Sequence, residues 1–182
     1  HLAAEHGEPI TPMDGADLGR GWTDEELAAW LDRARVPYER PDDLAAAVAA
    51  ELAADRIVAW FQGRAEYGPR ALGHRSLLAH PGHAANTERL NDVKGREPFR
   101  PVAPMVLAER AGEIFTRGPL TSPYMLFIHD VRPGWRELIP AVVHVDGTAR
   151  IQTVDRRREP LLARLLEEFE ARTGLPVLVN TS

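Results

Sequence analysis

Residues 160–182, PLLARLLEEFEARTGLPVLVNTS, set the fold class, because they predict a helix followed directly by a buried strand. Pro160 is a typical first helical residue, and Gly174 is a typical residue for ending the helix. The apolar positions recur at helical spacing: Leu161, Leu162, Leu165, Leu166 and Phe169. The apolar run at 177–179 is short and β-branched, as in a buried strand.

Toward the N-terminus, helix and strand signals continue to alternate. Thr23 and Glu26 form a capping box that predicts a helix start, and residues 1–22 before it predict an irregular lead-in. Further helices are expected from Pro41, from an Asn86 cap to about Lys94, and near 109–115. Strands are expected at 57–61, 104–107, 124–129, 141–145 and 149–154. Trp22 and Trp30 are interpreted as core or docking residues. The pattern favours one α/β (α+β) domain.

Composition excludes several classes of protein. The 182 residues are 44% hydrophobic and 27% charged, as in globular domains and unlike disordered or fibrous chains. No apolar run approaches the roughly 20 residues of a membrane span, and the first residues lack the apolar region of a signal peptide. Cysteine is absent from the sequence, which excludes disulfides and thiolate metal sites. We therefore expect a cytoplasmic domain from a longer protein, with no membrane contact.

Charge is distributed unevenly along the chain. Residues 1–55 carry a net charge of −9, residues 56–100 carry +4, and residues 101–182 carry 0. A basic segment in an acidic chain indicates a local site for an anionic ligand and argues against a broad nucleic-acid surface. Of the 22 basic residues, Lys94 is the only lysine, and it lies inside this basic segment.

Two motifs carry most of the basic residues in this segment. The first, GRAEYGPRALGHRS at 63–76, places three arginines among three glycines. Flexible backbone with guanidinium groups is typical of phosphate binding, and a solvated loop with local ion pairs is the alternative. The second motif, NDVKGREPFRPVAP at 91–104, holds Arg100 in a proline-stiffened turn. A rigidly held arginine suits phosphate binding, and a simple turn between helix and strand is the alternative. Both interpretations can hold together.

Other candidate chemistry is weaker. His74, His80 and His83 lack the spacing that places two imidazoles on one helix face, so we expect no protein-built metal site. Ser76 shows no sign in the sequence of a Ser-His-Asp arrangement.

Five blocks, in this order, carry a resemblance to a known family: GRAEYGPRALGHRSLLAHP, LNDVKGREPFRPVAPMVL, SPYMLFIHD, IPAVVHVDGTARIQTV and PVLVNTS. From about Leu18 to Ser182 the chain resembles the C-terminal domain of the O-carbamoyltransferases, which act on antibiotics and nodulation factors. In that family a YrdC-like domain, a twisted mixed β-sheet flanked by helices, follows a larger Kae1-like domain. The resemblance therefore implies a linker at 1–22 and a YrdC-like domain at 23–182 that lacks the usual C-terminal extension.

The resemblance also implies a reaction and a set of site residues. Such domains bind carbamoyl phosphate and ATP, with Mg²⁺ as a possible companion of ATP, and form carbamoyl adenylate for transfer to a hydroxyl of a small natural-product acceptor. Its carbamoyl-phosphate pocket would comprise Arg70, Lys94, Arg100, Arg150 and Asn180. Its weaker candidates for the ATP phosphates are Arg75, Ser76, Thr181 and Ser182. We expect Lys94 to carry the decisive catalytic charge, and Arg96 to pair only with Glu97 or another acid.

Two other functions remain open from the sequence. The domain could be a non-catalytic anion-binding module that docks on its own Kae1-like partner domain. It could also be a YrdC-like enzyme that makes threonylcarbamoyl adenylate for tRNA, although the acidic N-terminal third and the carbamoyltransferase-type blocks oppose any nucleic-acid partner.

Overall fold

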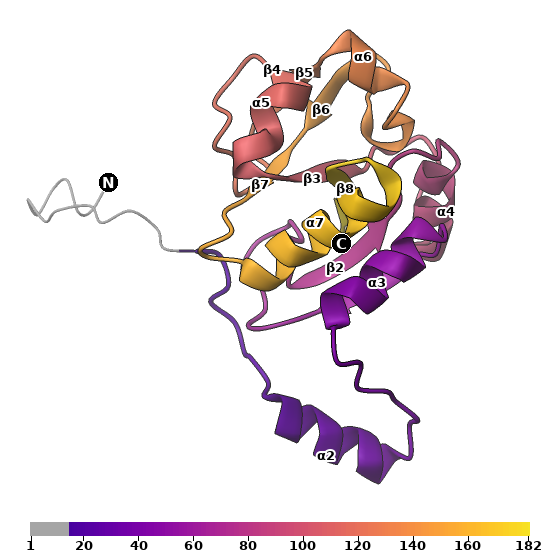
Figure 1. Cartoon of the computed structure of the whole chain (residues 1–182), viewed down its shortest axis with the longest axis vertical. Coiled ribbons are helices and arrows are strands. Elements are labelled where there is room, and N and C mark those ends of the chain that lie inside the picture. The colour runs from indigo at the N-terminus through magenta and orange to yellow at the C-terminus, as the bar shows by residue number, and fades with distance from the viewer. Residues whose placement is uncertain (1–14) are drawn as a thin grey trace, which may run out of the picture.

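A computed structural model describes residues 15–182 of the chain. Its helices are α2 (Asp24–Ala34), α3 (Leu44–Ala53), α4 (Asn86–Val93), η1 (Ala108–Arg110), α5 (Ala111–Ile114), α6 (Pro133–Arg136), η2 (Pro140–Val142) and α7 (Pro160–Thr173). Its strands are β1 (Val58–Phe61), β2 (Arg75–Ala79), β3 (Ala103–Leu107), β4 (Phe115–Thr116), β5 (Ile128–Val131), β6 (Thr148–Arg150), β7 (Gln152–Val154) and β8 (Val177–Thr181). Figure 1 shows their arrangement.

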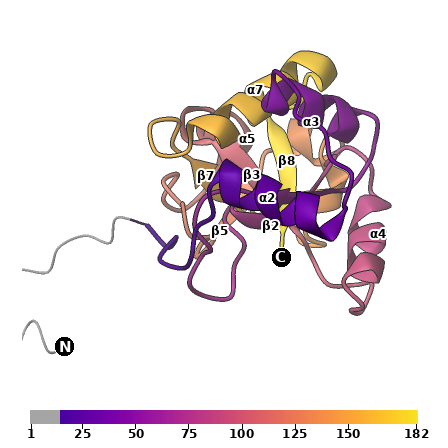
Figure 2. The same cartoon turned by 90° about the horizontal axis from the view of Figure 1, so that it is seen from below.

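Two sheets organise the fold. The larger has the order β1-β2-β8-β3-β7, in which only β3 and β7 pair in parallel among the described strands. The smaller has the order β4-β5-β6 and is antiparallel. Helices α3 and α7 pack against each other on one side of the larger sheet (Figure 2). The α/β class with a mixed sheet is thus confirmed.

Side-chain alternation along the central strands creates a core on each face of the larger sheet. On β8, Leu178 joins the core beneath α3 and α7, whereas Val177 and Val179 join the core on the opposite face. On β3, Met105 and Val106 divide between the two cores in the same way. Successive residues of a strand point to opposite faces, so a strand buried on both sides is apolar throughout.

The predicted helix boundaries hold best where caps are strong. Thr23 and Glu26 form the expected capping box of α2, and Gly174 ends α7 with a φ of 74°. The second helix begins at Leu44 rather than Pro41, because the Asp43 side chain accepts a hydrogen bond from the backbone N–H of Ala46.

The sequence predicted that Asn86 caps α4, but the structure shows no such cap. The Asn86 side chain is buried, and its Nδ2 donates to Asp55 Oδ1 at 2.7 Å and to the carbonyl of His80 at 2.9 Å. The amide therefore ties the start of α4 to the segment before β1 and to the segment after β2. The region near 109–115 divides into η1 and α5, with Phe115 already in β4.

Three strand predictions need correction. The strand expected at 124–129 is β5, which begins only at Ile128. Residues 140–142 form η2 where a strand was expected, since a proline at the first position favours a helical turn. The strand expected at 149–154 is two strands in different sheets, β6 and β7, separated by Ile151. In addition, β2 begins at Arg75, inside the motif interpreted as a loop.

Residues 15–34, the first part of the chain that the structure describes, have few buried side chains. Residues 15–22 form no helix or strand, and residues 1–14 of the predicted lead-in lie outside the described residues. Helix α2 lies apart from the sheets (Figure 1), and none of its described side chains is buried. Trp22 and Trp30 are 41% and 54% exposed, so they are not core residues, and the docking interpretation stays a prediction. No helix within residues 15–182 is long and apolar enough to cross a membrane.

Candidate cation-lined cavity

Glu66, the only acidic residue of the motif at 63–76, holds the backbone of this motif in place. The Glu66 carboxylate accepts hydrogen bonds from the backbone N–H groups of Leu72, His74 and Arg75, at 2.8, 2.7 and 3.3 Å. Gly73 has a φ of 100°, and a Cβ there would lie 2.2 Å from a methyl carbon of Leu162. Glycine is therefore required for this part of the loop to lie against α7.

Two of the three loop arginines are engaged by backbone carbonyls. Arg64 donates to the carbonyls of Leu18 and Gly19. Arg75 donates to four carbonyls at 2.6–3.3 Å, and its guanidinium carbon lies 3.5 Å from the Phe61 ring centroid. These contacts connect the loop to its neighbours and leave Arg70 as the loop arginine that lines a cavity.

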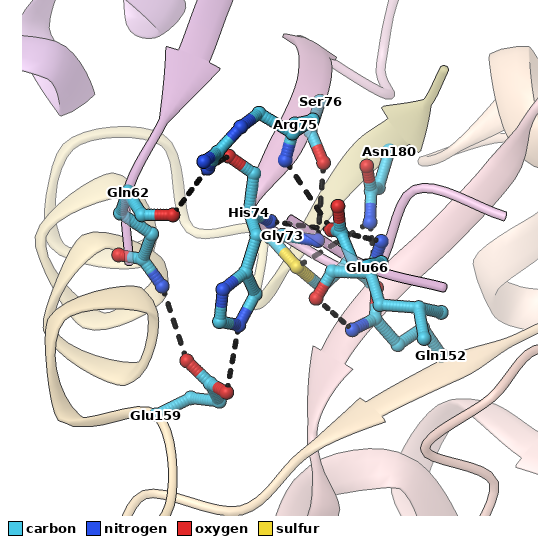
Figure 3. Close-up of polar contacts among 11 residues, drawn as sticks. Gln62, Glu66, Gly73, His74, Arg75, Ser76, Gln152, Glu159 and Asn180 are labelled. Atoms are coloured by element: carbon cyan, nitrogen blue, oxygen red, sulfur yellow. Dashed lines mark hydrogen bonds and ion pairs between the residues drawn. The ribbon is translucent and has the colours of Figure 1, made fainter. Parts of the chain in front are cut away.

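A histidine–carboxylate pair joins the loop at His74 to Glu159, the residue before α7 (Figure 3). His74 Nε2 lies 3.0 Å from Glu159 Oε1, and Gln62 Nε2 donates to Glu159 Oε2 at 3.0 Å. The hydrogen bond to Glu159 raises the pKa of His74 above its ordinary value, against the effect of burial. We call Arg64, Glu66, His74, Arg75 and Glu159 the framework cluster, since each is bonded to another part of the fold.

The cavity beside this loop has a volume of about 50 Å³. It lies where the loop, β6, the end of β8 and the turn before β3 converge. Its described lining contains no aspartate or glutamate and comprises Pro69, Arg70, Ala71, Arg96, Pro101, Val102, Ala103, Met125, Arg150, Asn180, Thr181 and Ser182. This composition suits a small anion.

The second motif supplies one lining cation, Arg96, whose position depends on a buried asparagine. Asn91 Nδ2 donates to the carbonyls of Pro98 and Arg100, at 2.8 and 2.9 Å, which holds the proline-stiffened turn against α4. Arg96 Nε donates to Asn91 Oδ1, and Arg96 Nη2 donates to the carbonyl of Pro101 at 3.1 Å. The guanidinium of Arg96 is therefore fixed at the cavity wall.

Arg96 does not form the ion pair that the sequence suggested. Glu97 Oε2 instead lies 3.5 Å from Arg100 Nη1, and both side chains are more than half exposed. Arg100 is absent from the cavity lining, although its charge lowers the pKa values of Lys94 and Arg96. Arg96 is thus a lining residue that the sequence interpretation undervalued.

Lys94 caps the end of α4 and reaches β8. Its Nζ donates to Thr181 Oγ1 at 2.7 Å, and Thr181 lines the cavity. Burial first, then the charges of Arg96 and Arg100, lower the pKa of Lys94 to about 8. Lys94 is itself absent from the lining and lies next to the cavity through its bond to Thr181. We call Lys94 and the three lining arginines, Arg70, Arg96 and Arg150, the cavity cations.

Arg150 shows most directly that the cavity lacks a counter-charge. Its Nε is buried and has no hydrogen-bond partner among the described residues. Burial first, then the charges of Arg70 and Arg96, lower the pKa of Arg150. An unpaired buried donor on a cation is costly, and an anion in the cavity would remove that cost.

The remaining predicted site residues are divided between the cavity and the framework. Asn180, Thr181 and Ser182 line the cavity, as Arg70 and Arg150 do. Arg75 and Ser76 do not. The Ser76 hydroxyl is buried and accepts from the backbone N–H of Gly73 at 3.0 Å, and the Arg75 guanidinium is engaged as described above.

The three histidines of the motif region serve separate contacts. His74 bonds to Glu159, while His80 Nδ1 accepts from the backbone N–H of Gly82, and its ring lies 4.5 Å from that of His83 between centroids. Among residues 15–182, no three histidine, aspartate or glutamate side chains are grouped as a metal site.

Comparisons with known proteins point to one family. The family model described as "Carbamoyltransferase C-terminus" matches residues 49–182. Nodulation protein U of Bradyrhizobium diazoefficiens is 49% identical over 98% of this chain and 32% of its own length. Nodulation protein NolNO of Sinorhizobium fredii is 45% identical over 92% of this chain and 25% of its own length. An uncharacterized protein of Synechocystis is 42% identical over 93% of this chain. The chain thus spans about a quarter to a third of these relatives.

Proposed function

The chain belongs to the carbamoyltransferase C-terminus family, and from that premise we propose that its cavity binds carbamoyl phosphate for carbamoyl transfer. The observation that carries this proposal is the convergence of Arg70, Arg96 and Arg150 on a small cavity whose described lining holds no carboxylate. Carbamoyl phosphate is a small dianion, and a guanidinium group can donate two parallel hydrogen bonds to the oxygens of one phosphate. The cations repel one another until such an anion is present.

Lys94 would supply the mobile charge in this site. A lysine ammonium is compact and rotates freely, so it can follow negative charge that moves during a reaction. Its present partner is the neutral hydroxyl of Thr181, which can be exchanged for a phosphate oxygen without breaking an ion pair. Arg100 lies outside the lining and would contribute to the general positive potential.

The proposed chemistry proceeds in two steps. The oxygen of water first forms a bond to the carbamoyl carbon, and phosphate leaves with the oxygen that bridged carbon and phosphorus, which gives carbamate and phosphate. A carbamate oxygen then attacks the α-phosphorus of ATP, and pyrophosphate leaves as carbamoyl adenylate forms. Carbamate is already nucleophilic, so the protein contributes mainly positioning and charge stabilisation.

The nucleotide would approach at the end of β8. Thr181 and Ser182 line the cavity and remain the better placed of the residues predicted for ATP. Arg75 and Ser76 could take part only by leaving their present carbonyl and amide partners. Because no carboxylate is present in the described lining, Mg²⁺ would be held by the ATP phosphates and water.

The complete transfer needs more chain than these residues. The relatives are about three to four times longer than the segment matched here. We propose that a Kae1-like N-terminal domain of the same protein receives the carbamoyl group and passes it to a hydroxyl of a small natural product.

Pyrophosphate release tests the proposal. The full-length protein is mixed with ATP and carbamoyl phosphate, and we expect pyrophosphate only when both are present. Millimolar carbamoyl phosphate should also raise the melting temperature, less so as salt rises. A folded protein whose melting temperature is unchanged would contradict the proposal. Binding without pyrophosphate release would indicate a non-catalytic anion-binding module, and threonine-dependent release would indicate threonylcarbamoyl adenylate formation.

A further inference from the structure

Two buried amide side chains form a short chain of hydrogen bonds behind the cavity (Figure 3). Gln152 on β7 donates through Nε2 to the carbonyl of Leu72 at 2.7 Å. Asn180 on β8 donates through Nδ2 to Gln152 Oε1 at 2.6 Å and to the carbonyl of Ala71 at 3.1 Å. Both side chains are almost completely buried.

Backbone carbonyls fix the orientation of both amides. A carbonyl oxygen can only accept a hydrogen bond, so the atom that faces Leu72 must be the Gln152 nitrogen, and the atom that faces Ala71 must be the Asn180 nitrogen. Turning either amide would bring two oxygens together in a buried place. The hydrogen-bond partners therefore determine which atom of each amide is nitrogen and which is oxygen.

This arrangement leaves one acceptor unused. Asn180 Oδ1 is buried and has no hydrogen-bond donor among the described residues. Asn180 also lines the cavity, together with the cations Arg70, Arg96 and Arg150. In a site surrounded by donors for an anion, this oxygen is suited to a ligand N–H.

We propose that Gln152 is a positioning residue that turns the Asn180 oxygen toward the carbamoyl nitrogen, which makes the site select carbamoyl phosphate over acyl phosphates without an N–H. This inference rests on the proposed function, because it assumes that the cavity binds carbamoyl phosphate. The cavity cations hold the phosphate of either ligand, while Asn180 distinguishes an amide –NH₂ from a methyl group.

The expected selectivity follows from the cost of an unpaired buried acceptor. Acetyl phosphate would place a methyl group where Asn180 Oδ1 needs a donor, whereas carbamoyl phosphate supplies one. Sites that hydrogen-bond a ligand N–H or O–H discriminate strongly against analogues that lack it, so we expect a preference of at least about tenfold. Inorganic phosphate, which lacks the carbamoyl group, reports on the cations alone.

Calorimetric binding of three probes to the full-length protein tests the inference: carbamoyl phosphate, acetyl phosphate and inorganic phosphate. Gln152→Leu should reduce the carbamoyl-over-acetyl preference to about threefold or less and change phosphate affinity by less than about twofold. Gln62→Leu is the matched control, because it also removes a glutamine that is bonded to a neighbouring element, Glu159, but lies outside the cavity lining. The control should keep the wild-type preference.

A double substitution tests whether Gln152 acts through Asn180. Gln152→Leu combined with Asn180→Ala should bind carbamoyl phosphate no more weakly than Asn180→Ala alone, which is the signature of residues that act as one unit. Gln152→Met provides a second variant of similar volume if the leucine variant does not fold. Additive losses would overturn the positioning role.

Wild-type binding separates this inference from the proposed function. If the folded wild-type protein binds none of the three anions, the proposed function fails and the inference fails with it. If it binds carbamoyl and acetyl phosphate equally well, the proposed function stands and the inference is overturned, whether or not any variant folds.

Discussion

The framework cluster and the cavity cations contain the same residue type within a few residues of each other, yet their surroundings are opposite. Arg75 donates to four carbonyls and stacks on Phe61. Arg70, from the same motif, lines a cavity that contains no carboxylate in its described part. An arginine whose donors are engaged by the fold stabilises the fold, whereas an arginine gathered with other cations is available to a ligand.

The comparison also separates the two kinds of pKa shift. In the framework cluster the Glu159 hydrogen bond raises the pKa of His74, so the folded state favours its charged form. In the cavity, burial and neighbouring cations lower the pKa values of Lys94, Arg96 and Arg150, so the folded state opposes their charge. The fold therefore stabilises the charge of His74 and opposes the charges of these three cavity cations, as expected of groups that lack an anionic partner.

The largest expected effect comes from removing Lys94, the lysine that bonds to Thr181 at the edge of the cavity. Lys94→Ala in the full-length protein should lower carbamoyl transfer at least about a hundredfold, the scale of losing a key electrostatic stabiliser. Stability should change little, since the lowered pKa of Lys94 shows that its charge is not favoured by the folded state. Steady-state transfer rates and thermal melting measure the two quantities.

Lys94→Arg should also be impaired, because a planar guanidinium cannot replace a compact ammonium beside Thr181. Arg96→Ala is the variant for comparison. Arg96 lines the cavity and also bonds to Asn91, so this variant changes both the cavity charge and the contacts of the turn. A folded Lys94→Ala protein with near-normal transfer would remove the special role of the lysine.

The next effect, on stability, comes from the framework cluster. Arg75→Ala removes the hydrogen bond to the partly buried carbonyl of Gln62, an exposed one to Gly63 and the contact with the Phe61 ring, and should lower the free energy of unfolding by about 2 kcal/mol. Urea unfolding followed by circular dichroism measures it. Arg56→Ala is the control, because Arg56 only forms an exposed ion pair with Glu51 and should change stability by less than about 1 kcal/mol. Equal stabilities of the two variants would contradict the division into framework and cavity.

A smaller effect is expected for the cavity arginine of the same loop. Arg70→Ala should weaken carbamoyl phosphate binding by about tenfold, the effect of losing one charge-assisted phosphate contact, without lowering the melting temperature. Arg64→Ala is the matched variant, since Arg64 donates to the carbonyls of Leu18 and Gly19. It should leave the affinity unchanged. Similar affinities for the two variants would place the ligand elsewhere.

The smallest effect concerns pH. The raised pKa of His74 means that its pairing with Glu159 contributes fully to stability below the unfolded value of 6.5 and is lost as pH rises through the folded pKa. Wild-type stability should therefore decline as pH rises above 6.5, relative to the stability of Glu159→Gln. Unfolding free energies between pH 5.5 and 8 compare the two proteins. Parallel pH curves would show that the pair is not coupled to folding.

The fold could be predicted where local physics is decisive. The capping box at Thr23 and the strong apolar period of α7 depend only on neighbouring residues, and both are confirmed. The break between β6 and β7 depends on tertiary packing. At 140–142 the local signal was Pro140, and the apolar run after it led to the wrong prediction of a strand. An apolar run such as AVVHV carries no signal that distinguishes a strand from a buried turn.

The site was predictable in its charge but not in its detail. The basic segment and the motifs indicated an anion site, yet nothing local shows that Arg75 is bound by carbonyls while Arg70 lines the cavity. Gln152 gave no signal at all, because its role depends on the carbonyl of Leu72, eighty positions earlier in the chain. Contacts between distant segments are fixed only by the fold.

The break at Ile151 has a mechanical consequence for the cavity. Arg150 lies at the end of β6 in the smaller sheet, and Asn180 lies in β8 of the larger sheet. Two sides of the cavity therefore belong to different sheets. Ile151 is the one residue between β6 and β7, and it is completely buried in the core on one face of the larger sheet. Because Ile151 directly follows Arg150, the packing of this apolar residue influences the spacing of the two sides of the cavity.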